Sequence, residues 1–131
     1  MEGTFVELFI GVNWLAVIVG AIVAYALGAL WYSQKFFGAA WMRGSGAPGV
    51  HKHPMALAML AQAGATFLFA LIIGITETTN NILFAILIIL TASGLIKANG
   101  LFADKSYTAI AIETGFVIAM GVVFILTHAV I

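Results

Sequence analysis

The sequence predicts an all-α membrane protein with four transmembrane helices, arranged as two antiparallel hairpins with a short interfacial segment after the first helix. Of its 131 residues, 63% are hydrophobic and 8% are charged, and the mean hydropathy is +1.15. A soluble domain carries about 25% charged residues. This scarcity of charge excludes a soluble enzyme, a nucleic-acid-binding protein and a disordered chain, and it indicates lipid as the surrounding solvent.

Four apolar stretches each reach the ~20 residues that a helix needs to cross ~30 Å of hydrocarbon. They cover residues 10–32, 55–75, 82–101 and 107–131. Backbone polar groups in lipid must bond within their own segment, which favours helices. A membrane barrel would need alternating strands of ~10 residues, whereas these apolar runs are continuous. We therefore expect one domain spanning residues 1–131.

The connections between these stretches differ in length. Residues 76–81 and 103–106 form short turns, which make consecutive helices antiparallel neighbours. Residues 33–54 form the one long loop, and its start is both aromatic and basic. The interfacial residues that we identify here are Trp31, Tyr32, Lys35, Trp41 and Arg43. Such a mixture is typical of an aromatic belt and of a segment lying at the membrane surface, and it would also suit docking of a headgroup or partner.

Basic residues predict the orientation of the chain. Lys35, Arg43 and Lys52 lie in the long loop and Lys105 lies in the last turn, whereas the N-terminal tail and residues 76–81 carry none. Positive charge is retained on the cytoplasmic side. We expect a multi-pass protein of the bacterial cytoplasmic (inner) membrane with loop 33–54 inside and both termini outside. The tail before the first helix has no basic residue and is not expected to be a removable signal peptide.

Two parts of the chain resemble a known family. The N-terminal signature covers Asn13-Trp14 and the residues after it, Leu27 to Ser33, and Phe37 to Met42; the C-terminal half contributes Asn99 to Phe102, Gly115-Phe116 and Met120-Gly121. These motifs are similar to the bacterial membrane family catalogued as domain of unknown function seventeen-sixty-one. The resemblance spans nearly the whole chain and implies four helices, but it brings no activity. One departure is Glu113, where that family is expected to carry Asn.

Strongly polar groups inside a span are costly, and each needs a reason. Tyr25, Gln62, Lys97 and Glu113 lie at similar depth, about seven residues or ~10 Å from the inferred cytoplasmic ends. Lys97 and Glu113 are also nearly equidistant from the last turn, which predicts that they pair across adjacent helices. One interpretation is a structural salt bridge; the other is a proton- or ion-coupled site, because a carboxylate beside a lysine has a tunable pKa.

Two further sets of residues stand out. Asn13, Trp14 and His128 are expected to form a polar cap at the outer end. Small residues suited to helix packing lie on the first and last helices, at Gly20, Ala24, Gly28, Ala111, Gly115 and Ala119. The last helix thus has a polar and a small face that both suit burial, which favours self-association.

Three functions are compatible with these features. First is an interaction or scaffold protein, or an accessory subunit, in a homo-oligomer or larger membrane complex. The alternative is a small ion- or proton-coupled transporter or channel using Lys97 and Glu113. An enzyme acting on lipid ranks third, because no nucleophile motif or metal-ligand set is recognisable. No catalytic residue, metal or cofactor is expected, and the net charge of zero argues against a nucleic-acid partner.

Overall fold

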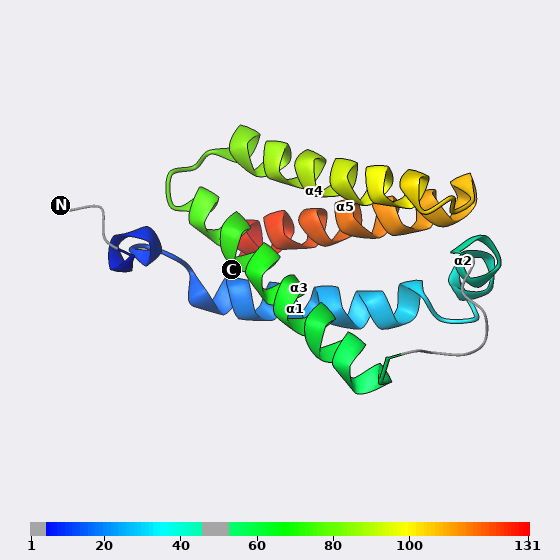
Figure 1. The fold of residues 1–131 in the computed structure, drawn as a ribbon. Helices are drawn as coiled ribbons and strands as arrows, with labels where there is room; N and C mark the ends of the chain where they lie inside the picture. Colours follow the sequence, from blue (N-terminus) through cyan, green and yellow to red (C-terminus); the bar gives the residue numbers. More distant parts are fainter. Residues whose placement is uncertain (1–4, 46–52) are drawn as a thin grey trace.

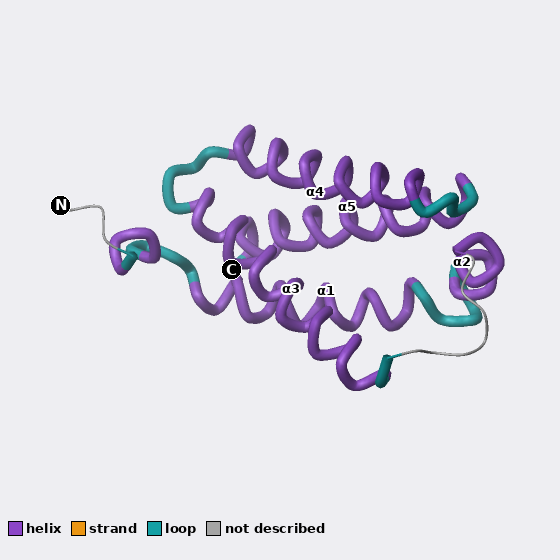
Figure 2. Tube along the Cα trace, viewed as in Figure 1, coloured by secondary structure: helices purple, strands orange, loops and turns teal. Residues whose placement is uncertain are grey.

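The computed structural model describes residues 5–45 and 53–131, and all of their regular elements are helices (Figure 2). In chain order these are the 3-10 helix η1 (Val6–Phe9), α1 (Trp14–Trp31), α2 (Gly38–Ser45), α3 (Met55–Glu77), α4 (Ile82–Phe102) and α5 (Tyr107–Val130). Within the described residues, α1, α3, α4 and α5 are long and apolar enough to cross a membrane. The predicted fold class is confirmed, and the protein is a multi-pass membrane protein. Lys52, used in the orientation argument, lies outside the described residues.

The first helix differs most from its predicted bounds. Residues 10–32 were expected to be helical, but α1 begins at Trp14. Gly11 has a φ of +84°, a left-handed backbone conformation, so residues 10–13 are not part of the helix. The side chain of Asn13 then accepts a hydrogen bond from the backbone N–H of Ala16 at 3.1 Å, so Asn13 acts as the N-cap. The other three spans agree with their predicted bounds to within two residues.

Both short turns contain a residue in the left-handed backbone conformation. Asn80 and Asp104 adopt left-handed conformations, with φ of 54° and 57°. In each turn the N–H of the next residue returns to a carbonyl of the last helical turn, which is the Schellman arrangement. Asn81 and Ser106 then cap the following helix through their side chains. Each hairpin therefore reverses direction within a few residues, as the short connections predicted.

Helix α5 is the centre of the bundle. Figure 1 shows α4 beside α5, α1 on the other side of α5, and α3 crossing obliquely over α1. In its most apolar stretch 44% of the residues of α5 are buried, against 17–22% for the other three spans. The hydrophobic core therefore surrounds α5.

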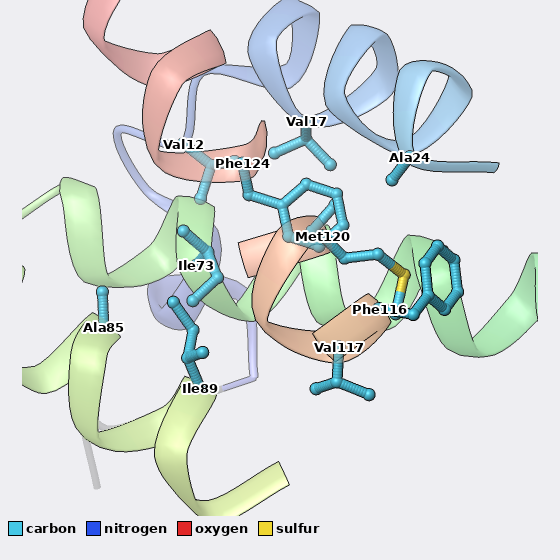
Figure 3. Packing of buried hydrophobic residues seen from close by; sticks show 11 residues of the cluster. Val12, Val17, Ala24, Ile73, Ala85, Ile89, Phe116, Val117, Met120 and Phe124 are labelled. Carbon is cyan, nitrogen blue, oxygen red and sulfur yellow. The ribbon is translucent and has the colours of Figure 1, made fainter. Parts of the chain in front are cut away.

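The core joins side chains from all four spans. Val17 of α1, Ile73 of α3 and Ile89 of α4 gather around Phe124 and the other inward residues of α5 (Figure 3). Small residues of α1 allow this approach. A Cβ atom added at Gly20 would lie 2.9 Å from Thr127 Oγ1, and one at Gly28 would lie 2.9 Å from the Phe116 ring. Ala24 between them is fully buried.

Helix α3 leaves the bundle along its length. Residues 55–65 are all exposed, whereas one face is buried from Thr66 onward. Figure 1 shows α3 diverging from α4 with distance from their shared turn. The distance between the two helices therefore increases towards the end of the molecule where α2 lies.

Candidate functional site

Glu113 is the centre of the strongest polar cluster. Lys105 Nζ lies 2.7 Å from Glu113 Oε2, and the indole N–H of Trp41 donates to the same oxygen at 2.8 Å. The side chains of Lys105 and Glu113 are only 21% and 14% exposed. Both bonds fall on Oε2, and Oε1 receives no hydrogen bond from the described residues. One carboxylate oxygen is therefore still able to accept a donor.

Helix α2 carries Trp41, and a contact with the start of α5 holds this helix in place. The N–H of Ser106, the N-cap of α5, donates to the carbonyl of Gly44 at 2.8 Å. A Cβ atom at Gly44 would lie 2.0 Å from Ser106 Oγ, so only glycine permits this approach. The contact fixes α2 on the first turns of α5, which brings Trp41 over Glu113.

Tyr32, the residue after α1, closes the cluster on another side. Its ring packs edge-on against Trp41 at 5.4 Å and against Phe116 at 5.5 Å between centroids. Burial, and next to it the negative charge of Glu113, raises the pKa of Tyr32 to about 12. The phenol therefore stays protonated at neutral pH. Within the described residues its hydroxyl has no hydrogen-bond partner, so it remains an available donor.

The interfacial aromatic residues are turned inward. The indole N–H of Trp31 donates to the carbonyl of Ile112 at 3.0 Å, and Trp41 donates to Glu113. Both side chains and Tyr32 are half-buried against α5. The reason is that an indole N–H near a packed interior needs an acceptor, and α5 supplies it. Lys35 and Arg43 are exposed at the same end of the molecule.

This cluster forms one end of a cavity of about 480 Å³ between α3, α4 and α5. Five residues form its polar end, and apart from Thr66 apolar residues line the rest. The polar end consists of Tyr32, Gln62, Asn99, Lys105 and Glu113; the other lining residues include Phe69, Leu95, Phe116, Val117 and Met120. The lining residues Phe116, Val117 and Met120 of α5 are buried, whereas those of α3 and α4 are mostly exposed. The cavity thus has α5 as its floor and opens between α3 and α4.

The predicted pair of Lys97 and Glu113 is wrong. Lys97 is exposed and lies beside Ala111 and Thr114, at a separate hollow on the other side of the contact between α4 and α5. Lys97 and Glu113 lie at nearly equal distance from the turn, so the prediction of equal depth was reasonable. They nevertheless lie on opposite sides of the contact between α4 and α5. Lys105 reaches Glu113 instead, because it precedes it by eight residues, just over two helical turns.

The predicted polar layer is divided between two places. Gln62 lines the same cavity as Glu113, and its amide N–H donates to Thr66 Oγ1 at 2.8 Å. Tyr25 instead donates its hydroxyl to the carbonyl of Met59 at 3.2 Å and joins α1 to α3 away from the cavity. The structure therefore brings together Gln62 and Glu113, and adds residues that the sequence had not linked to them.

The predicted outer polar cap is not one cluster. Asn13 caps its own helix, and Trp14 packs near Phe9 with ring centroids 6.0 Å apart. His128 lies within 2.9 Å of the Phe124 carbonyl through Nδ1. Its buried Nε2 has no partner among the described residues and faces Gly74, where an added Cβ would lie 3.1 Å away. No hydrogen bond between described residues joins His128 to Asn13 or Trp14.

The small residues on the last helix are partly used within the chain. A Cβ atom at Gly115 would lie 3.3 Å from the Trp31 ring, so this position packs against α1. Ala119 is half-buried, and only Ala111 is exposed. Gly115 therefore packs within the chain, while self-association through the rest of this face stays a prediction.

The site offers hydrogen bonding and compensated charge. Its acceptors are carboxylate and amide oxygens, and its donors are an ammonium, a phenol and amides. Within the described ranges, no group of three or more His, Cys, Asp or Glu side chains is placed to hold a metal ion. The arrangement is suited to recognising a polar group at the edge of an apolar space.

Comparisons with known proteins agree with the resemblance seen in the sequence. Neither the search of curated proteins nor the search of solved structures gives a match. A family model described as "Protein of unknown function (DUF1761)" matches residues 15–129. The matched region runs from the first turn of α1 almost to the end of α5 and contains every residue of the cavity. The chain therefore belongs to the DUF1761 family.

Proposed function

We propose that the protein is a non-enzymatic interaction protein or accessory subunit in the bacterial cytoplasmic membrane. It works in a homo-oligomer or in a larger membrane complex, and it contacts further copies of itself. The supporting observation is the exposed first half of α3, residues 55–65. It is rich in small residues, namely Ala56, Ala58, Ala61, Ala63, Gly64 and Ala65. In lipid, small residues mark faces where another helix backbone can approach closely.

Gly64 is one exposed position on this half of α3 where a second helix can approach. A Cβ atom added there would meet nothing within 4 Å, so the glycine leaves a notch that this chain does not fill. Gly20, Gly28 and Gly74 lie on α1 and α3 at close helix contacts, so glycine serves packing elsewhere in the fold. A second copy presents the same notch, and two identical faces pair about a twofold axis.

Crosslinking tests this interface directly. The chain has no cysteine, so Gly64→Cys introduces a single thiol that an oxidant can couple between two copies in native membranes. We expect a disulfide-linked dimer with Gly64→Cys and far less with Ala29→Cys, a matched control at an exposed small residue of α1. We also expect Gly64→Leu to shift native mass spectra from dimer to monomer. A wild type that is strictly monomeric in mild detergent would contradict the proposal.

We further propose that both termini face outward. η1 and the α3–α4 turn lie at one end of the bundle, and α2 and the α4–α5 turn lie at the other (Figure 1). The first end carries Glu7 and Glu77, whereas the second carries Lys35, Arg43 and Lys105 together with Asp104. The basic end is the one expected on the cytoplasmic side.

A second candidate function is ion- or proton-coupled transport, now with Lys105 in the place first given to Lys97. The supporting observation is that Glu113 lies within a span, lines a cavity and keeps one oxygen without a partner among the described residues. Glu113→Gln should then abolish flux in proteoliposomes without changing assembly, while the matched change Lys97→Gln leaves flux intact. Equal flux in wild type and Glu113→Gln would exclude this role.

A further inference from the structure

We propose that the cavity between α3, α4 and α5 binds a neutral single-chain amphiphile, with a hydroxyl-bearing head at the Lys105–Glu113 pair and its apolar chain along Phe116 and Met120. This inference is separate from self-association through α3, although Gln62 and Ala65 belong to both regions. It rests on the direction of the cavity, its charge balance and its unused hydrogen-bonding groups.

The polarity of the cavity changes along the membrane normal. Lys105 lies just before α5, whereas Met120 lies in the middle of that helix. At 1.5 Å per residue, these two residues are about 20 Å apart along the helix axis. The polar end is therefore near the membrane surface and the apolar end near the midplane. A lipid-like molecule in the same leaflet already has this orientation, so it can enter between α3 and α4 without turning over.

The charge balance favours an uncharged head. Lys105 and Glu113 compensate each other at 2.7 Å, so the polar end carries no net charge. An ion entering this space would lose hydration without finding an unpaired opposite charge. A hydroxyl group needs only a donor and an acceptor, and it leaves the ion pair in place.

Unused groups for such a hydroxyl are present at the polar end. Glu113 Oε1 is an acceptor, and the Tyr32 hydroxyl is a donor; neither has a partner within the described residues. Asn99 also lines this end, and its exposed amide offers both a donor and an acceptor. One hydroxyl can accept from Tyr32 and donate to Glu113. The glycerol head of a monoacylglycerol carries two hydroxyls and can use Asn99 as well.

The size and walls fit a single chain. The volume of about 480 Å³ lies in the usual range of about 300–1,000 Å³ for sites of small apolar ligands. Phe116, Val117 and Met120 form a buried apolar floor. Ala65 of α3 and Ala92 of α4 place small side chains at the two edges of the cavity. A slender apolar chain can lie along this floor between the two edges.

Three probes with the same hydrocarbon chain test the head-group preference. We would measure binding of 1-monooleoylglycerol, oleate and oleylamine to the full-length protein in nanodiscs, by competition with a photoreactive monoacylglycerol. We expect the neutral probe to bind at least about tenfold more tightly than either charged one. Crosslinks should map to the lining residues of α4 and α5. Equal affinity for the three probes, or crosslinks confined to other surfaces, would overturn the proposal.

Substitutions at the ion pair should change the preferred charge in opposite directions. Glu113→Gln leaves Lys105 unpaired, so oleate should become the preferred probe. Lys105→Gln leaves Glu113 unpaired, so oleylamine should become preferred. Lys97→Gln, a matched loss of a lysine on the far side of α4, should leave the neutral preference unchanged. Retention of the wild-type order by both pair variants would contradict the proposed head site.

Filling the cavity from its two edges tests the chain site. Ala65→Phe and Ala92→Phe enlarge side chains on these edges, and each should weaken binding of 1-monooleoylglycerol at least about tenfold. Ala29→Phe on the exposed face of α1 is the control and should have no effect. Tyr32→Phe, which removes only the hydroxyl, should weaken binding about fivefold to tenfold, as expected for one hydrogen bond. Unchanged binding in both filled variants would overturn the proposal.

Discussion

Glu113 lies within a membrane helix, yet a lysine from the turn just before that helix compensates its charge. The sequence predicted the depth of Glu113 and the need for a basic partner. It did not identify Lys105, because counting from the turn gives depth but not the side of the helix pair on which a residue lies. A spacing of eight residues along one chain segment was the available signal.

The ion pair predicts unequal effects of single and double substitution. Lys105→Met or Glu113→Met alone leaves one charge without its partner in a mostly buried site, and each should lower the free energy of unfolding by about 3 kcal/mol. The double variant should lose clearly less than the sum of the two. Lys97→Met, which alters an exposed lysine, should be nearly neutral. Thermal unfolding in detergent measures all four, and strictly additive losses would contradict the pair.

Gly74 predicts a local packing effect. A Cβ atom there would lie 2.7 Å from Val17 Cγ2 and 3.1 Å from His128 Nε2. Gly74→Ala should therefore destabilise the protein by about 1–3 kcal/mol through overpacking. Gly94→Ala is the control, because an added Cβ at Gly94 meets nothing within 4 Å, and it should stabilise α4 by about 0.5–1 kcal/mol. A loss at both sites would show that helix contacts are not the cause.

Tyr32 predicts a titration at high pH. Because burial and the Glu113 charge raise its pKa from 10.0 to about 12, the neutral phenol's contribution to stability is complete below pH 10 and is lost as the pH rises to about 12. Ultraviolet titration should show a late ionisation phase that is lost in Tyr32→Phe. Glu113→Gln should lower this pKa but not restore it to 10.0, since burial is the larger cause. A late phase that survives in Tyr32→Phe would refute the assignment.

At the scale of elements, the four spans were predictable because length and apolar composition dictate them. A short interfacial segment after the first helix was also predicted, but the bounds of α2 and the presence of η1 were not. Helix α2 depends on Gly44 fitting against Ser106, and η1 precedes a Gly11 with positive φ. The two hairpin turns use Asn80 and Asp104 where glycine is the usual signal. Such features follow from individual contacts and leave only a weak pattern in the sequence.

We expect the stability of helix α2 on the bundle to depend on the indole N–H of Trp41. Trp41→Phe keeps an aromatic ring but removes the N–H that donates to Glu113, a bond to a charged group worth about 1.5–3 kcal/mol. Amide hydrogen exchange in α2 should become faster, while α4 stays protected. Trp14→Phe, at a residue 44% exposed and remote from α2, should leave the exchange of α2 unchanged. Unaltered exchange of α2 in Trp41→Phe would show that other contacts hold this helix.

At the scale of the whole molecule, the family and the four-span architecture were correctly predicted, but the cavity was not. Its existence depends on the angle at which α3 leaves α4, and helix crossing angles are set by packing among several segments. The sequence also suggested α5 as the oligomer face, and in the structure the Trp31 ring packs at Gly115 while Ala111 stays exposed. The exposed small half of α3 takes that role in our proposal.

The proposed orientation predicts which ends react with a reagent that does not cross membranes. The chain has no cysteine, so single variants give unambiguous labelling. Asn80→Cys in the α3–α4 turn should react with an impermeant maleimide in intact cells. Lys35→Cys, exposed at the opposite end, should react only after permeabilisation. The reverse pattern would invert the topology and the positive-inside interpretation with it.

The eight-residue separation of Lys105 and Glu113 also bears on how the protein enters the bilayer during synthesis. Lys105 lies in the turn before the last helix and Glu113 in its first two turns, so their ion pair needs no other segment of the chain. Trp41, already synthesised, needs only to dock. We therefore expect Glu113 to enter the bilayer with its charge already compensated by its own segment.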